Sequence, residues 1–438
     1  MRLQASQAAQ GIGATLRGDD VEFDGASFDT RTLEPGQMFV AIVAERDGHD
    51  FLDAAEENGA VVHLVSRDDA GGDGASSGAR RSRIVVDDTA EALMRLGGWA
   101  RDRSSATVVG VTGSVGKTST KDLIATACAS QRVTSANVRS FNNEQGLPTT
   151  ILGSADDTEV LVLEMGMRGF GQITRLCDVA RPDIGVVTTV GHSHTELVGG
   201  IEGVATAKQE LVQALPSSGV AVLNADDDRV AAMARATDAE VVTFGRTGEV
   251  RITDLELDEL ARARFTIETP WGSERVELAV SGEHMATNAA AALAVAGSIG
   301  VDLAAAVAAL GGARVSSMRM EVTRSASGAL VVDDCYNANP TSMAAALDAL
   351  VAMEATRRFA VLGPMGELDD PGAGHHEVAR RAEGLGIQLV ATGTDLYGVR
   401  PTDDPVAMLG DLGEGDVVLV KASRAAGLER VVAELVGP

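Results

Sequence analysis

The segment from Val108 to Thr118 constrains this chain more than any other. It reads Val-Val-Gly-Val-Thr-Gly-Ser-Val-Gly-Lys-Thr, an apolar run that passes into a glycine-rich loop and closes on Gly-Lys-Thr. Residues 118–129 then follow a helical pattern, so the order is strand, loop and helix, as in nucleotide-binding loops. The strict motif has glycine at position 111, where this chain has valine. The segment is a variant phosphate-binding loop and predicts chemistry on ATP or GTP.

The residue types of this loop suit a triphosphate. Glycines let the backbone approach the phosphates, and the N–H groups together with the positive end of the helix face the negative charge. Lys117 can reach the β and γ oxygens, and the Thr118 hydroxyl can ligate Mg2+. The alternative is an ordinary glycine-rich turn, which the complete Gly-Lys-Thr context disfavours. We expect the loop contacts to ATP to come from Gly113, Ser114, Val115, Gly116, Lys117, Thr118 and Ser119.

Length and charge limit the classes of protein to consider. A chain of 438 residues with 45% hydrophobic content suggests about three globular domains. A net charge of -26 argues against nucleic acid or anionic lipid as a partner. The first thirty residues lack a signal-peptide pattern and no window has eighteen uninterrupted apolar residues, so we expect no membrane span and a cytoplasmic protein. The charge by itself does not decide whether the protein is adapted to salt.

Cysteine and lysine are both scarce. Cys128, Cys177 and Cys335 have no metal-ligand spacing and are expected to be buried hydrophobic residues. The chain has four lysines, so 33 of its 37 basic residues are arginines. Because lysine is a compact cation whose amine can lose its proton and react, each lysine calls for a reason. Lys121 is expected to be a solvated helix residue, and Lys208, taken alone, would be assigned the same way.

The apolar pattern divides the chain into α/β units, placed at residues 1–105, 106–312 and 313–438. Strands alternate with amphipathic helices, which predicts mostly parallel sheets with helices on both faces. The expected strands are 37–43, 60–65, 106–111, 160–163, 184–187, 220–223, 330–332, 359–362, 388–391 and 417–420. The expected helices are 51–59, 118–129, 201–214, 286–298, 341–353, 375–384 and 424–435, and residues 70–83 are expected to form an exposed loop or insertion.

Three further segments carry polar groups at predicted strand ends. Glu164 closes an apolar strand, where it is favoured as a Mg2+ ligand over a surface carboxylate. Residues 188–196 follow the next strand and include His192 and His194. Residues 333–340, Asp-Asp-Cys-Tyr-Asn-Ala-Asn-Pro, suit the ribose and polar edges of a nucleotide, with a plain Asx/Pro turn and helix cap as the alternative.

Six segments in order resemble the Mur ligase family, and within it the member that adds D-alanyl-D-alanine to UDP-N-acetylmuramoyl-tripeptide. They are residues 113–118 (Gly-Ser-Val-Gly-Lys-Thr), 141–144 (Phe-Asn-Asn-Glu), 164–168 (Glu-Met-Gly-Met-Arg), 224–227 (Asn-Ala-Asp-Asp), 318–321 (Met-Arg-Met-Glu) and 336–340 (Tyr-Asn-Ala-Asn-Pro). The resemblance spans nearly the whole chain. It implies three α/β domains: a small N-terminal domain that binds UDP, a central P-loop ATPase with a mostly parallel sheet, and a C-terminal Rossmann-like domain.

The resemblance also implies roles for individual residues. Substrate would be bound by Asp29, Thr30, Arg31 and His49 at the uridine end, by Asn142 and Asn143 at the muramoyl-peptide, and by Lys421 and Arg424 of the closing motif, together with Ser423. ATP would also contact Asn288, Arg319, Asp334 and Asn337. One Mg2+ would be held by Thr118 and Glu164, and a second by His194 and by Lys208 if Lys208 is carbamylated. The expected catalytic set is Lys117, Glu164, His194, Lys208 and Arg319.

The family's reaction is an ATP-dependent amide ligation through an acyl phosphate, with Lys117, Arg319 and Mg2+ stabilising charge on the transferring group. Joining substrates held by three domains implies closure around ATP, and a monomer is expected. Another Mur-family ligase and folylpolyglutamate synthase are the nearest alternatives, and a P-loop switch or ATP-dependent binding protein is the alternative from a different class.

This chain departs from the family at four positions: Thr189 replaces a usual Asn, His192 a small residue or Pro, Pro364 an Asp and Ala422 a Gly. The sequence leaves four points open. They are whether His192 or His194 serves the metal, whether Lys208 is carbamylated, the oligomeric state, and whether the third residue of the acceptor peptide is diaminopimelate or lysine.

Overall fold

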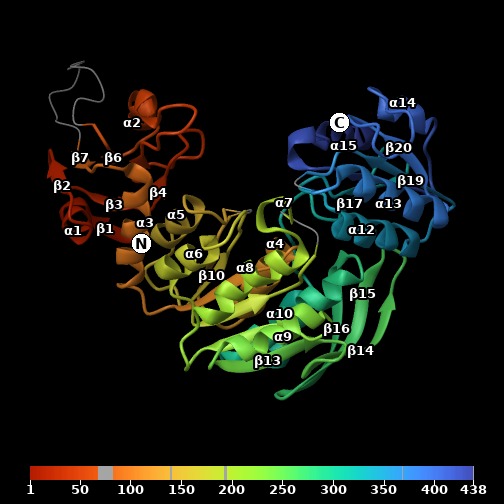
Figure 1. Ribbon diagram of the computed structural model, residues 1–438, viewed down its shortest axis with the longest axis horizontal. Coiled ribbons are helices and arrows are strands. Elements are labelled where there is room, and N and C mark those ends of the chain that lie inside the picture. The colour runs from red at the N-terminus through yellow and green to blue at the C-terminus, as the bar shows by residue number, and fades with distance from the viewer. Residues whose placement is uncertain (68–81, 139–140, 192–194, 367, 438) are drawn as a thin grey trace.

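The computed structural model describes residues 1–67, 82–138, 141–191, 195–366 and 368–437. Among the described residues, three sheets of five, nine and five strands follow one another along the chain, and Figure 1 shows the first and the last at opposite ends of the large middle one. Each sheet lies inside one of the three ranges expected from the sequence. Within the described residues no helix is both long and apolar enough to cross a membrane.

The N-terminal unit is built on a five-stranded sheet of order β2-β7-β6-β5-β4, in which only β2 is antiparallel to its neighbour. A two-stranded antiparallel sheet of β1 and β3 stands beside it. Its strands are β1 (Arg2–Gln4), β2 (Thr15–Arg17), β3 (Glu22–Asp24), β4 (Ala26–Ser27), β5 (Met38–Val40), β6 (Val62–Val65) and β7 (Ser82–Val85). Its helices are α1 (Ala5–Gly11), the 3-10 turn η1 (Gly48–Phe51), α2 (Leu52–Glu57) and α3 (Thr89–Arg101). Most of the loop expected at 70–83 lies outside the described residues, and its last two residues belong to β7.

The central sheet has nine strands in the order β16-β15-β14-β13-β12-β11-β8-β10-β9. They are β8 (Thr107–Thr112), β9 (Thr134–Ala136), β10 (Val160–Glu164), β11 (Ile184–Val187), β12 (Val220–Asn224), β13 (Glu240–Gly245), β14 (Val250–Leu257), β15 (Arg262–Thr269) and β16 (Gly272–Ser281). The accompanying helices are α4 (Lys117–Ala129), α5 (Gly146–Leu152), α6 (Gln172–Ala180), α7 (Thr195–Val198), α8 (Ile201–Gln213), α9 (Asp228–Ala232), η2 (Met233–Ala236), α10 (His284–Ser298) and α11 (Leu303–Leu310).

Neighbouring strands run parallel in the part of the sheet with the order β14-β13-β12-β11-β8-β10-β9, which confirms the expected parallel sheet. Alternate residues of β10 face different cores: Val160 and Val162 lie with residues of α4 and α10, whereas Leu161 and Leu163 lie with residues of α5, α6 and α8. Helices therefore cover both faces. The antiparallel extension β14–β16 was not expected from the sequence. Many of its residues are exposed or half-buried, as is typical of antiparallel strands with one solvent-exposed face.

The C-terminal sheet has the order β17-β18-β21-β19-β20, parallel except for β17. Its strands are β17 (Glu321–Arg324), β18 (Leu330–Asp333), β19 (Arg357–Leu362), β20 (Gln388–Ala391) and β21 (Asp416–Lys421). Its helices are α12 (Pro340–Ala352), α13 (Pro371–Gly384), α14 (Pro405–Leu409), η3 (Arg424–Ala426) and α15 (Glu429–Val436). The three cysteines are free and buried, as expected.

Helix α3 joins the N-terminal unit to the central one. It begins after Asp88, whose carboxylate accepts the N–H groups of Ala90 and Glu91. It then packs against α5 and α6, and a Cβ added at Gly97 would lie 2.5 Å from Cβ of Pro148 in α5. The neighbouring Gly98 has no such contact within 4 Å. Of these two glycines, only Gly97 is required for the close approach of α3 and α5.

The adjacent glycines give a matched test of that contact. We expect Gly97→Ala to lower stability by about 1–3 kcal/mol because the added methyl group overpacks the α3–α5 interface. Gly98→Ala should raise stability by up to about 1 kcal/mol, because alanine favours the helix. Calorimetric unfolding of both variants checks this, and equal shifts in the same direction would contradict it.

Candidate functional site

A cavity of about 680 Å³ lies where the central unit meets the C-terminal unit. Its walls come from the loop before α4, the ends of β10 and α10, and the C-terminal segments around residues 319, 337 and 421. The carboxyl ends of β8 and β10 open onto it, which is where open α/β sheets bind ligands. Six of the seven loop residues expected to contact ATP line this cavity, and Gly113 is the exception.

The phosphate-binding loop is shaped by two glycines and braced by a neighbouring segment. A Cβ at Gly113 would lie 1.8 Å from Oγ1 of Thr188, and a Cβ at Gly116, where φ is +86°, would lie 2.8 Å from Oδ1 of Asn288. The Val115 N–H donates to Oγ1 of Thr189 at 3.2 Å. Thr189, which replaces the family's usual Asn, thus holds the loop through its hydroxyl. Lys117 Nζ donates to the Gly113 carbonyl at 2.6 Å.

Glu164 connects three segments at the floor of the cavity. Its side chain is 1% exposed, its Oε2 accepts the Thr118 hydroxyl at 2.7 Å and its Oε1 accepts the Asn142 amide at 2.7 Å. A carboxylate and a hydroxyl beside a phosphate loop fit the hard oxygen ligands that Mg2+ prefers. Among the described residues, no three or more Asp, Glu, His or Cys side chains lie together so that they could by themselves hold a metal ion. Phosphate oxygens and water would therefore complete the coordination of a metal held here.

Lys208 projects from α8 into the same cavity. It is 2% exposed, so its assignment as a solvated residue is wrong. No hydrogen bond or ion pair of its amine occurs within the described part of the chain. Burial, with a smaller contribution from the charge of Lys117, lowers the pKa of Lys208 well below its ordinary value. The site therefore favours the neutral amine more than water does. His192 and His194 lie outside the described residues.

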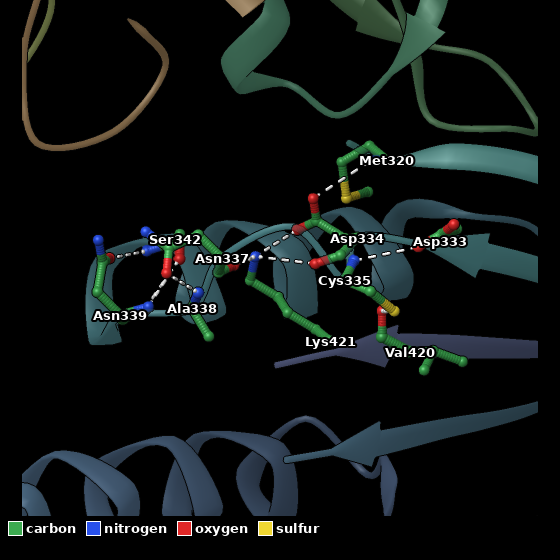
Figure 2. A network of polar contacts seen from close by, with 10 residues as sticks. All are labelled: Met320, Asp333, Asp334, Cys335, Asn337, Ala338, Asn339, Ser342, Val420 and Lys421. Atoms are coloured by element: carbon green, nitrogen blue, oxygen red, sulfur yellow. Dashed lines mark hydrogen bonds and ion pairs between the residues drawn. The ribbon is translucent and has the colours of Figure 1, made fainter. Parts of the chain in front are cut away.

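Lys421, at the end of β21, organises the C-terminal wall. Figure 2 shows its side chain reaching the segment after β18, where Nζ contacts Oδ2 of Asp334 at 2.6 Å and the Asn337 carbonyl at 2.8 Å. Asn339 caps α12 by accepting the Ser342 N–H at 2.9 Å, and Ser342 in turn accepts the Asn339 N–H. The helix-cap alternative thus applies to Asn339, which also lines the cavity together with Asp334 and Asn337.

Arg319 enters the cavity from the connection between the two units. Its guanidinium lies 4.3 Å from the centre of the Tyr336 ring, and its buried Nε has no hydrogen-bond partner among the described residues. Met318 and Met320 on either side have φ of +62° and +55°, a strained conformation for residues other than glycine. An unsatisfied donor held this way is suited to an anion in the cavity.

The remaining predicted residues divide between the cavity and the N-terminal unit. Asn143 lines the cavity and also accepts the N–H groups of Gln145 and Gly146 before α5. Asn288 lines it from α10, and Arg424 lines it while pairing with Glu429 at 2.9 Å.

None of the four residues assigned to uridine lines this cavity. Arg31, with its side chain 86% exposed, pairs with Asp29, whose pKa this contact lowers, and the Thr30 carbonyl accepts the Asn58 amide. The buried His49 ring contacts Asp47 through Nδ1 and accepts the Ser66 N–H through Nε2. Both nitrogens of His49 are therefore engaged within the protein, and a uridine contact by these residues stays a prediction.

His284 is a cavity residue that the sequence reasoning missed. It begins α10 one turn before Asn288, and burial lowers its pKa. Residues four apart on a helix share a face, so the position of Asn288 together with the expected helix could have indicated it.

Comparison with known proteins finds consistent similarities over the chain. The Mur ligase middle domain matches residues 111–296, and the family described as Mur ligase, glutamate ligase domain matches residues 318–436. UDP-N-acetylmuramoyl-tripeptide–D-alanyl-D-alanine ligase of Mycobacterium tuberculosis is 40% identical over 93% of this chain and 91% of its own length. The structure of MurF from Acinetobacter baumannii superposes with a TM-score of 0.84 at 28% identity, covering 100% of this chain and 99% of that one. MurF from Thermotoga maritima in complex with ADP gives a TM-score of 0.79 at 30% identity, covering 93% and 96%.

Removing the charge of Glu164 tests whether this carboxylate serves a metal-bound nucleotide. We expect Glu164→Gln to weaken binding of ATP in the presence of Mg2+ at least tenfold, about 1.4 kcal/mol, because the amide carries no charge and replaces one of the two accepting oxygens with an NH2 donor. Titration calorimetry measures the affinity. Glu159→Gln, an exposed change immediately before β10, is the control. Equal affinity of the two variants would contradict the assignment.

Proposed function

This chain belongs to the Mur ligase family, and from that premise we propose that it joins D-alanyl-D-alanine to UDP-N-acetylmuramoyl-tripeptide, with ATP cleaved to ADP and phosphate. The proposal is supported by relatives with this activity in their names over nearly the full chain. The observation that carries it is one cavity lined by the phosphate loop, Glu164 and Asn142 from the central unit and by Arg319 from the C-terminal unit. That arrangement serves a reaction that must place ATP beside two further substrates.

The chemistry follows from the poor reactivity of a carboxylate toward amines. A terminal carboxylate oxygen of the tripeptide attacks the γ-phosphorus, the bond from phosphorus to the ADP oxygen breaks, and an acyl phosphate forms. The amine of D-alanyl-D-alanine then attacks the acyl carbon, loses a proton and expels phosphate. Lys117 and Arg319 supply positive charge to the transferring phosphoryl group, and no protein nucleophile is required.

The residues present fit a requirement for Mg2+. Thr118 and Glu164 would hold one ion beside the phosphates, with Lys208 as a carbamate and His194 serving a second. Bound Mg2+ would neutralise the negative charge of the phosphates. Asn142, which donates to the Glu164 carboxylate, would orient the muramoyl-peptide.

Lys208 is proposed to carry a carbamate. Its buried amine favours the neutral form, which is the form that reacts with CO2. The nitrogen bonds to the carbon of CO2, one C=O electron pair moves to oxygen, and the nitrogen releases a proton. The product is an anion, which offers oxygen ligands to a metal and a favourable charge beside Lys117.

The other parts of the proposal concern substrate placement and setting. Asp29, Thr30, Arg31 and the His49 region would receive the uridine end, and Lys421 and Arg424 would face the incoming dipeptide. The enzyme would act as a monomer in the cytoplasm, and closure of the units would keep the acyl phosphate from water.

Phosphate release from ATP and Mg2+ tests the proposed reaction. We expect release to require both UDP-N-acetylmuramoyl-tripeptide and D-alanyl-D-alanine, with the pentapeptide product identified by mass. Diaminopimelate- and lysine-containing tripeptides are compared in the same assay. Hydrolysis indifferent to both substrates would favour the P-loop switch instead.

Removal of CO2 tests the carbamate. We expect activity of the degassed enzyme to fall and to return with bicarbonate, because the carbamate forms reversibly. A carbamate carbon signal after addition of ¹³C-bicarbonate should appear in the intact enzyme and be absent from Lys208→Met. A Lys208→Met variant that keeps this signal, or an intact enzyme that never shows it, would refute the modification.

A further inference from the structure

Lys121 is a buried charge for which the proposed reaction has no use. Its expected exposure in solvent is wrong, since the side chain is 2% exposed on α4, one turn after the phosphate loop. Its ammonium donates to the Asn137 carbonyl at 2.6 Å and pairs with Oδ1 of Asp122, also at 2.6 Å. Burying a charge is costly, so a lysine here requires these partners to be held firmly in place.

The first partner, Asn137, leads to the floor of the cavity. It is 2% exposed and follows β9. Its Oδ1 accepts the backbone N–H of Glu164 at 2.9 Å, and its amide donates to the Phe141 carbonyl at 3.3 Å. The next residue, Asn142, holds the Glu164 carboxylate. Lys121 thereby fixes α4 to the segment that supplies two of the site's polar groups.

The second partner, Asp122, leads to the connection between the units. Its Oδ2 accepts both the backbone N–H and the hydroxyl of Ser316, at 2.7 and 2.8 Å. Two residues later the chain is attached to the C-terminal unit, because the Tyr336 N–H donates to the Met318 carbonyl at 3.3 Å. The change from one unit to the other therefore takes place between Ser316 and Met318, directly before Arg319.

We propose that Lys121 and Asp122 are a positioning pair that sets the distance between the phosphate-binding helix, the Asn142–Glu164 floor and the connection that delivers Arg319. This inference rests on the proposed ligase function and adds to it two residues that do not line the cavity. The Lys121 ammonium contacts the Asn137 carbonyl and the Asp122 carboxylate at the same time. The segments bound to these two groups therefore keep fixed positions relative to the phosphate loop. An error of about 1 Å in such a register can cost about 10²-fold in rate.

Lys121→Met tests the pair, because methionine fills similar space without a donor. We expect kcat to fall about 10²-fold while the KM for ATP changes less than about threefold, and the Mg2+ concentration for half-maximal rate to rise. Cys128→Ala is the matched control: it removes a buried side chain two turns later on the same helix, outside this network. Equal losses of kcat in the two variants, at equal folded fraction, would overturn the proposal.

Ser316→Ala provides a second variant that removes only one hydroxyl at the surface of the connection and leaves the core intact. We expect kcat to fall about threefold to tenfold at unchanged KM, and the double variant with Lys121→Met to lose less than the product of the two single effects. An unchanged kcat in Ser316→Ala overturns the proposal, and it does so even if Lys121→Met fails to fold.

Calorimetric binding of ATP with Mg2+ separates this inference from the proposed function. If the wild-type protein makes no pentapeptide, the ligase proposal fails. The positioning pair is then judged by binding alone: Lys121→Met should raise the Mg2+ concentration needed for half-maximal ATP binding, and Cys128→Ala should not. An equal Mg2+ requirement in these two variants overturns it.

Discussion

The buried carboxylate of Glu164 is the contact on which the rest of the site depends. A charge with 1% exposure is tolerated only where hydrogen bonds replace water, and here the donors are Thr118 from the phosphate loop and Asn142 from the segment before α5. Three segments distant in sequence are thus brought to one edge of the sheet. The backbone of Glu164 is held as well, through Asn137, so the position of the carboxylate is fixed from both ends of the residue.

The distribution of positive charge follows the same geometry. The chain carries a net charge of -26, yet Lys121, Lys208 and Lys421 are each only 2% exposed and lie in or next to the cavity. Each has a different environment: Lys121 joins a carbonyl to a carboxylate, Lys421 pairs with Asp334, and Lys208 has no such partner among the described residues. A compact ammonium fits these enclosed positions, whereas the surface cations of this protein are arginines. The isolated lysine is the one whose chemistry differs, because its amine is driven toward the neutral form.

The connection between the central and C-terminal units has an unusual conformation that the site explains. Met318 and Met320 adopt positive φ, and the residue between them presents to the cavity a guanidinium whose buried Nε has no hydrogen-bond partner in the described part of the chain. This short segment is held at both ends, by Tyr336 against the guanidinium and by Asp122 of α4, which accepts the Ser316 N–H. A strained backbone conformation persists where surrounding contacts hold it in place. Here those contacts direct the Arg319 side chain into the cavity.

The sequence alone determined the elements whose signal is local. Val108–Thr118 specified a phosphate loop because glycine positions and a Gly-Lys-Thr ending depend on neighbours in the chain, and the alternating strands and helices specified parallel sheets because periodicity is also local. Only the tertiary structure decided which polar residues are buried. Lys121 has the pattern of a surface helix residue, but Asn137 and Ser316, 16 and 195 positions away, enclose it and its neighbour Asp122. Likewise no local pattern shows that the folded chain places the Ser66 N–H against the second ring nitrogen of His49. Burial and hydrogen-bond partners arise from long-range packing, which no local pattern encodes.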